Sequence, residues 1–246
     1  MKLKVITIDF WNTIFDNSRG SERNAHRQKA LINGIDKFGI VVKQDEFSEA
    51  LSKSWEYFNT IWKGEQRTPA PRETVEFLWN YLKLPFDETV ITEVVKEFGD
   101  SVLVIPPNPM EAVKESLEFL SAEYSLGLIS DTGFSPGTVL RDLLKMNDIY
   151  HNFSEFSFSD ETGVSKPHPK AFGKILNTLN CKPSEALHVG DIEATDIAGA
   201  KAMGMKAIRF AGDPTAAHTL GNSDSTIADY TADNWHIVVE IINSIN

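Results

Sequence analysis

Four side chains that could act together in phosphoryl transfer are spread across the 246-residue sequence. Asp9, Ser130 and Asp191 each stand at the end of an apolar run, and Lys166 stands directly before Pro167 at the expected start of a helix. A carboxylate such as Asp9 can attack phosphorus and hold the phosphoryl group covalently, which divides one difficult step into two. The phosphoryl oxygens carry negative charge, so a hydroxyl and an ammonium group are suitable partners for them. These residue types predict a nucleophile at Asp9 and phosphate-binding groups at Ser130 and Lys166.

A divalent cation would resolve the repulsion between the Asp9 carboxylate and a bound phosphate. Mg²⁺ is a hard cation that takes carboxylate, carbonyl and phosphate oxygens in an octahedral arrangement. Asp191 is the second carboxylate that we expect to hold it. The sequence therefore predicts Mg²⁺ between Asp9 and Asp191.

The apolar runs before these residues indicate buried strands of a parallel sheet. Such strands are covered on both faces by helices, and ligands bind beyond their carboxyl ends. Strands and helices alternate from Pro106 onward, which predicts a doubly wound, Rossmann-like α/β fold whose edge brings Asp9, Ser130 and Asp191 together. We expect strands at Val5–Ile8, Leu126–Ile129, Phe153–Phe158, Ala186–Val189 and Lys206–Phe210, and helices at Met110–Leu120, Thr138–Lys145, Ala171–Leu179, Ile197–Met203 and Trp235–Ile242.

A helical segment separates the first strand from the rest of the α/β pattern. Apolar side chains recur there at helical spacing, as in the aromatic stripe Trp55, Phe58 and Trp62. We expect this stripe to pack in the core of a small all-helical domain rather than to contact substrate. The predicted division is an α/β core domain of residues 1–17 and 105–246 and a helical domain of residues 18–104.

The motifs and their order resemble those of the haloacid dehalogenase-like (HAD) hydrolase superfamily over nearly the whole chain. The first motif of that superfamily, Asp-x-Asp-x-Thr, corresponds to Asp9–Thr13, and the second and third correspond to Ser130 and Lys166. The fourth, Gly-Asp-x-x-x-x-Asp, corresponds to Gly190–Asp196. The resemblance implies that the helical domain is a cap that selects the substrate, and that the protein hydrolyses a small phosphomonoester with Mg²⁺.

The resemblance also assigns roles to neighbouring residues. It implies that the backbone carbonyl of Trp11 is a third metal ligand. Asp196 would orient the ligands or Lys166, and Asp131 would help to bind phosphate. Trp11 stands where the superfamily has its second aspartate, which in phosphatases protonates the leaving group and then activates water. An indole does neither, so turnover should be slow unless Asp131 or Glu193 substitutes.

Two alternative functions remain open at this point. A metal-free 2-haloacid dehalogenase carries an aromatic residue, tyrosine, at the place of Trp11, but the carboxylates Asp191 and Asp196 favour a metal site. A phosphate-ligand binding or regulatory protein with little turnover would also be compatible with Trp11. Arg19 and Arg23 could reach a substrate anion, although we expect them on a solvated helix face.

Composition limits the classes of partner. The chain has 35 Asp and Glu residues against 24 Lys and Arg residues, a formal net charge of −11, which argues against binding to a nucleic-acid backbone. Cys181 is the only cysteine, so a reducing compartment fits and no intrachain disulfide forms. The sequence shows neither a signal-peptide pattern nor an apolar run of membrane length. We expect a cytoplasmic monomer or homodimer that acts on a small phosphorylated molecule.

Overall fold

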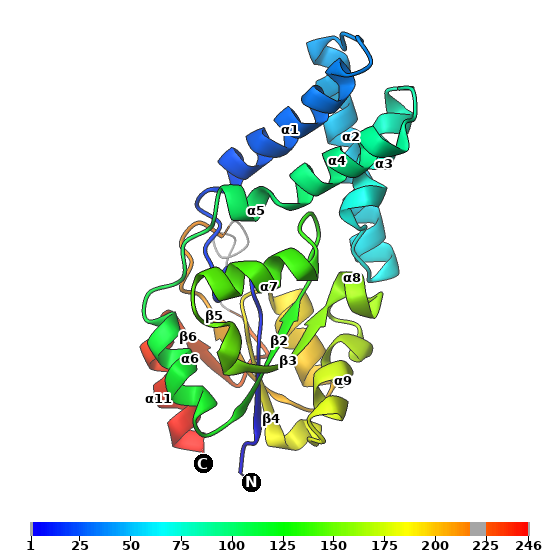
Figure 1. Ribbon diagram of the computed structural model, residues 1–246. Helices are drawn as coiled ribbons and strands as arrows, with labels where there is room; N and C mark the ends of the chain where they lie inside the picture. The colour runs from blue at the N-terminus through cyan, green and yellow to red at the C-terminus, as the bar shows by residue number, and fades with distance from the viewer. Residues whose placement is uncertain (1, 217–224, 246) are drawn as a thin grey trace.

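Six parallel strands form the central sheet of the computed structural model, which describes residues 2–216 and 225–245. Their order is β3-β2-β1-β4-β5-β6, so the chain builds outward on one side of β1 and then on the other (Figure 1). This order confirms the predicted doubly wound α/β fold and places a switch point beside β1, where such folds bind ligands. The strands are β1 (Val5–Ile8), β2 (Ser125–Ser130), β3 (Phe153–Phe158), β4 (Ala186–Gly190), β5 (Lys206–Phe210) and β6 (Tyr230–Ala232).

Helices cover both faces of the sheet. One face packs against α6, α7 and α11 in a core that contains Ile6 and Ile8, and the other packs against α9 and α10 in a core that contains Val5. Because β1 is buried along its whole length, it presents apolar side chains to both layers. The helices of this part are α6 (Val113–Ser121), α7 (Gly137–Met146), α8 (Ser159–Thr162), α9 (Pro169–Thr178), α10 (Ala198–Ala202) and α11 (Trp235–Ile245), with short 3₁₀ turns at Tyr150–Asn152 and Pro183–Glu185.

Four long helices form a separate layer beyond the carboxyl ends of the strands (Figure 1). They share their own apolar core, which includes Leu31, Val75 and Ile91. Local signals fix two of their starts: Pro71 opens one helix, and the Asp87 carboxylate accepts the free backbone N–H groups at the start of the next. The helices are α1 (Gly20–Asp36), α2 (Gln44–Glu65), α3 (Pro71–Tyr81) and α4 (Glu88–Gly99), and the short α5 (Ser101–Val104) leads back to the sheet.

Four of the five predicted helix starts differ from the structure by one to three residues, and the backbone explains two of these differences. The helix expected from Met110 begins at Val113, because Ala112 has a φ of 59° and a left-handed residue cannot continue a helix backward. The helix expected from Ile197 begins at Ala198. Ile197 is the last residue of a π-helical turn, Glu193–Ile197, and its amide donates to the carbonyl of Ile192 at 3.3 Å. None of the helices in residues 2–216 and 225–245 is long and apolar enough to cross a membrane.

Candidate active site

Asp9 and Asp191 follow adjacent parallel strands and therefore lie at the same edge of the sheet. Ile8 of β1 is paired with Val189 of β4, and the amide of Asp9 donates to the carbonyl of Val189 at 2.9 Å. Asp191 comes one residue after β4 ends at Gly190. Their exposed fractions are only 5% and 2%. The backbone register of two strands thus sets the spacing of the two carboxylates.

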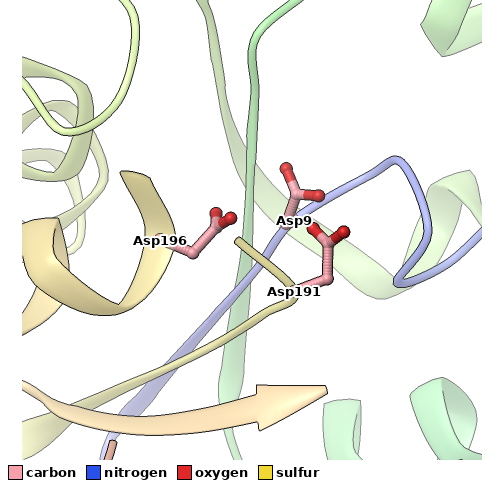
Figure 2. A group of neighbouring side chains, drawn as sticks. All are labelled: Asp9, Asp191 and Asp196. Carbon is pink, nitrogen blue, oxygen red and sulfur yellow. The ribbon is translucent and has the colours of Figure 1, made fainter. Parts of the chain in front are cut away.

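A third carboxylate, Asp196, joins this pair from the π-helical turn. A Cβ atom at Gly190 would lie 2.6 Å from Cβ of Asp196, so only glycine allows this close approach. The carboxylate accepts the amide of Ile192 at 3.0 Å, which holds it toward the strand ends. Figure 2 shows the three carboxylates directed toward a common space, and one oxygen from each lies within 4.8 Å of the corresponding oxygens of the other two.

Lys166 places one ammonium group among these carboxylates. Its Nζ donates to Asp196 Oδ1 at 2.6 Å, to Asp9 Oδ1, and to the carbonyl of Ile129 at the end of β2 at 3.2 Å. The side chain is 3% exposed and comes from the segment directly before α9, whose first residue is Pro169. The structure therefore brings the predicted nucleophile and the predicted phosphate-binding lysine into direct contact.

The charges of this cluster do not balance without a further cation. Three buried carboxylates face one ammonium group, which leaves a deficit of two positive charges when all four are ionised. Burial, together with Asp196 and Asp191, raises the pKa of Asp9 well above its usual range despite Lys166. Burial alone would lower the pKa of Lys166, but Asp196 and Asp9 raise it above its ordinary value, so the lysine stays charged. A divalent cation on the carboxylate oxygens fits this donor set.

Asp196 is tied to a buried polar chain that the sequence analysis did not find. Its Oδ1 lies 3.1 Å from His188 Nε2, and His188 Nδ1 lies 2.9 Å from Thr7 Oγ1. Burial lowers the pKa of His188, and a neutral ring that donates from Nε2 and accepts at Nδ1 satisfies both contacts. Thr7 on β1 and His188 on β4 are register partners. Two polar residues facing each other across otherwise apolar strands were the sequence signal that could have revealed this contact.

Ser130 and Asp131 stand at the end of β2 beside the lysine. Ser130 is 1% exposed, and its hydroxyl has no hydrogen-bond partner in the described part of the chain. Asp131 accepts the backbone amide of Lys166 at 3.0 Å and the indole N–H of Trp62 at 3.0 Å. Burial raises the pKa of Asp131, and the nearby Lys166 only partly offsets this effect. The Trp62 contact joins the helical layer to the strand ends.

The loop after Asp9 turns sharply over the site. Asn12 has a φ of 55°, which asparagine tolerates, and its side-chain amide donates to Asp191 Oδ2 at 3.1 Å. Trp11 is half-buried against Phe10, with ring centroids 5.0 Å apart. Like Thr7 and His188, Asn12 is a site residue that the sequence analysis missed.

Two adjoining cavities open above these residues. A cavity of about 300 Å³ is lined by Asp9, Lys166, Asp191 and Asp196, and by Trp11 and Trp62. A cavity of about 480 Å³ lies mainly against the helical layer. Trp11, Asn12 and Asp131 line both, so the two spaces are neighbours. The site has room for a small phosphorylated molecule.

Three sequence-based expectations about the surroundings are wrong. The stripe Trp55, Phe58 and Trp62 lines the smaller cavity and is absent from the core of the helical layer, because helical periodicity identifies a face and not what that face meets. Glu193 accepts hydrogen bonds from residues 226 and 227, so its carboxylate is committed away from Asp9. Arg23 is 2% exposed and lines the larger cavity, whereas Arg19 lies on the surface beside Glu22.

Comparison with known proteins decides the family. The sequence matches the description "haloacid dehalogenase-like hydrolase" over residues 3–204. The chain belongs to the haloacid dehalogenase-like hydrolase family. This HAD-like chain is 30% identical over 210 residues to a glyceraldehyde 3-phosphate phosphatase of Pyrococcus furiosus, covering 85% of this chain and 81% of that protein. The predicted hydrolase class is thus confirmed.

Solved structures share the fold of this chain. A 2-haloacid dehalogenase of Pseudomonas syringae superposes with a TM-score of 0.68 at 20% identity, covering 99% of this chain and 100% of that one. A magnesium-bound HAD-hydrolase of Bacillus subtilis gives a TM-score of 0.65 at 14% identity, with the same two coverages. At these identities the likeness concerns the fold alone, so the reaction must be argued from the site.

Proposed function

We propose that this HAD-like hydrolase is a Mg²⁺-dependent phosphatase of a small phosphomonoester. The observation that carries the proposal is the buried contact of Asp9 with Lys166 beside Asp191, on the wall of a cavity of about 300 Å³. The three carboxylates make a metal-free dehalogenase less suitable, because they leave an uncompensated negative charge beside the nucleophile. The names of its relatives support phosphate-ester hydrolysis as well.

Asp9, Asp191 and the backbone carbonyl of Trp11 would hold Mg²⁺ at the strand ends. When bound, Mg²⁺ offsets the charge of the carboxylates and polarises a phosphoryl oxygen. Asp196 does not need to bind the metal, since its Oδ1 already accepts from Lys166 and its Oδ2 from Ile192. It holds Lys166 in place.

The reaction then proceeds in two displacements. An oxygen of Asp9 attacks phosphorus, the bond from phosphorus to the ester oxygen breaks, and the alcohol leaves with a proton. Water next attacks phosphorus, the bond to Asp9 breaks, and inorganic phosphate leaves. Lys166 and the unpartnered hydroxyl of Ser130 stabilise the charge on the phosphoryl oxygens.

The proton for the leaving alcohol is the difficult part of this chemistry here. Trp11 has no titrating group, and Glu193 is bonded elsewhere. Asp131 is the best candidate, because it lines the smaller cavity and burial raises its pKa, so it keeps a proton to higher pH than an exposed aspartate. We therefore propose slow turnover, fastest on esters with good leaving groups.

We further propose that residues 18–104 act as a cap domain on a core of residues 1–17 and 105–246. Side chains of α1 and α2 line the larger cavity together with the loop after β2, so this layer would select the substrate. Glyceraldehyde 3-phosphate is the first substrate to test, because several relatives carry its name. The expected assembly is a monomer or a homodimer.

The test measures phosphate release from 4-nitrophenyl phosphate and glyceraldehyde 3-phosphate, and chloride release from 2-chloropropionate. Each substrate is assayed in Mg²⁺ and in chelator, with wild type, Asp9→Asn and the surface control Asp142→Asn. We expect phosphate release that requires Mg²⁺ and is lost only in Asp9→Asn.

Two results would overturn the proposal. Chloride release in chelator without phosphate release would identify a dehalogenase. Tight binding of inorganic phosphate without turnover of any ester would identify a phosphate-binding protein.

A further inference from the structure

Two arginines on α1 face the larger cavity one helical turn apart. Arg23 is 2% exposed and Arg27 is half-buried, and both line the space of about 480 Å³. Their spacing of four residues puts both guanidinium groups on the same side of the helix. The cavity wall on this side is therefore positively charged in a chain whose formal net charge is −11.

Neither arginine has an acidic partner among the ion pairs in residues 2–216 and 225–245. Arg23 Nη2 donates to the side chain of Asn17 at 2.7 Å, and Arg27 Nη1 donates to Asn24 at 3.0 Å. Arg23 Nη1 and Arg27 Nε are buried and have no hydrogen-bond partner in the described chain. By contrast, a glutamate pairs with each of four other arginines: Arg19, Arg67, Arg72 and Arg141.

The two carboxylates whose charges act on Arg23, Asp16 and Glu22, are engaged with other groups. Glu22 pairs with Arg19 at 2.8 Å, and Asp16 accepts hydrogen bonds from Asn108. A buried guanidinium with an unmade hydrogen bond is costly, and an anion between two such groups would recover that cost.

Aromatic rings cover the faces of both guanidinium groups. Arg23 lies 5.7 Å from the centroid of the Trp11 ring, and Arg27 lies 5.1 Å from that of Phe134 and 5.6 Å from that of Phe98. A planar guanidinium held by its face presents its N–H groups along its edge, the geometry that binds a carboxylate or phosphate. Burial and the neighbouring Arg23 lower the pKa of Arg27 to about 10, so it still carries its charge at neutral pH.

The arginine cavity adjoins the reaction cavity. Trp11, Asn12 and Asp131 line both spaces, and Asp9 lies on the wall of the smaller one. A phosphomonoester with its phosphorus at Asp9 can therefore extend past Trp11 toward α1. We propose that Arg23 and Arg27 bind a second anionic group of the substrate, at the end remote from the phosphoryl group that is hydrolysed. This inference rests on the proposed phosphatase function.

A three-carbon series tests the proposal, since its members differ only at the carbon farthest from the phosphate. 3-Phosphoglycerate carries a carboxylate there, glyceraldehyde 3-phosphate an aldehyde and glycerol 3-phosphate an alcohol. We expect wild type to prefer the carboxylate in kcat/KM. Fructose 1,6-bisphosphate against fructose 6-phosphate tests a second phosphate in the same way, and a preference confined to this pair would identify the anion as phosphate.

The variants are Arg23→Gln and Arg27→Gln, with Arg19→Gln, directly before the same helix, as the surface control. Each cavity variant should lower the ratio of kcat/KM for 3-phosphoglycerate to that for glycerol 3-phosphate by about 10–100-fold, as expected for hydrogen bonds to a charged group. Arg19→Gln should leave the ratio unchanged. Glycerol 3-phosphate also reports correct folding of each variant, because a misfolded protein would lose both activities together.

Calorimetry keeps the two proposals separable. Affinities of wild type and Arg27→Gln for 3-phosphoglycerate and glycerol 3-phosphate can be measured without turnover. An inactive protein that still binds 3-phosphoglycerate through Arg27 would refute the phosphatase and support the arginine site. Three results would overturn the arginine site: no preference in either the three-carbon series or the fructose pair, a preference for the aldehyde, or a ratio unaltered in both arginine variants.

Discussion

Lys166 and Asp196 form a buried ion pair, with 2.6 Å between Nζ and Oδ1, inside the cluster that holds Asp9. The same oxygen lies 3.1 Å from His188 Nε2, so Asp196 is held from two sides. Burial would raise the pKa of Asp196, but Lys166 and His188 lower it below its ordinary value. Asp196 therefore remains ionised and keeps the lysine directed at Asp9.

Asp196→Asn and Asp191→Asn should separate the two roles of these neighbouring carboxylates. We expect Asp191→Asn to weaken Mg²⁺ affinity sharply, because it removes a predicted ligand. Asp196→Asn should lower kcat by about 10–100-fold through misplacement of Lys166, with a smaller loss of affinity. Calorimetric titration with Mg²⁺ and steady-state kinetics measure the two effects. Equal losses of affinity in both variants would show that Asp196 binds the metal directly.

Asp9→Asn should stabilise the metal-free protein as pH rises. Burial raises the folded-state pKa of Asp9 well above the reference value of 3.8, so between these two values the folded state binds more protons than the unfolded state. Wild-type stability therefore falls as pH rises through that window, whereas asparagine does not titrate. In chelator, the Tm of Asp9→Asn should exceed that of wild type by a difference that grows as pH rises. Each kcal/mol of difference in stability corresponds to about 2–4 °C in Tm.

Mg²⁺ should reduce this difference if it binds the wild-type carboxylate as proposed. Asp142→Asn on α7 is the control, because this side chain pairs with Lys145 at the surface. A lower Tm of Asp9→Asn at every pH would mean that its ion pair with Lys166 outweighs the cost of burying the charge.

Ser130→Ala and Ser157→Ala should have opposite effects on stability and activity. The buried hydroxyl of Ser130 has no partner, so its removal should change the free energy of unfolding by less than about 1 kcal/mol, while the loss of a phosphate donor lowers kcat about 10²–10³-fold. The buried hydroxyl of Ser157 donates to the carbonyl of Ala171 at 2.7 Å, so its removal should cost about 1–3 kcal/mol of stability and leave kcat unchanged.

Denaturant unfolding and kinetics on one aryl phosphate measure both serine variants. A stability loss without an activity loss in Ser130→Ala would show that Ser130 is a packing residue only.

Trp11→Asp should restore the missing acid and base. A positioned general acid typically contributes about 10²–10⁴ in rate, and alkyl esters need leaving-group protonation more than aryl esters do. We therefore expect a larger gain on alkyl than on aryl phosphates. Trp11→Asn is the matched control, because asparagine has nearly the same size as aspartate and does not titrate. Efficient wild-type hydrolysis of alkyl phosphates with no gain in Trp11→Asp would place the proton donor elsewhere, with Asp131 the next residue to substitute.

Sequence reasoning located the strand ends well because a parallel sheet fixes their geometry. The predicted bounds of β3 and β5 agree with the structure, and Asp9 and Asp191 meet as adjacent strands require. The three-residue strand β6 was missed, since Tyr230–Ala232 is too short to show a pattern and gains its place from pairing with β5.

The surroundings of the site depend on packing that no periodicity records. The sequence predicts Arg19 and Arg23 on one solvated helix face, yet Arg23 packs against the Trp11 ring while Arg19 pairs with Glu22 at the surface. The His188 chain exists because Asp196 returns from the π-helical turn to the strand that it follows. Both features need the relative placement of elements, which local sequence does not specify.

The hydrogen bond from the Asp9 amide to Val189 anchors the proposed nucleophile to the framework of the sheet. The side chains of Asp9, Lys166 and the neighbouring carboxylates all belong to the α/β part of the chain, whereas Arg23, Arg27 and Trp62 come from α1 and α2. Exchange or lengthening of those two helices would therefore leave the reacting groups in register. Substrate preference can diverge in such a protein while its reaction class stays constant.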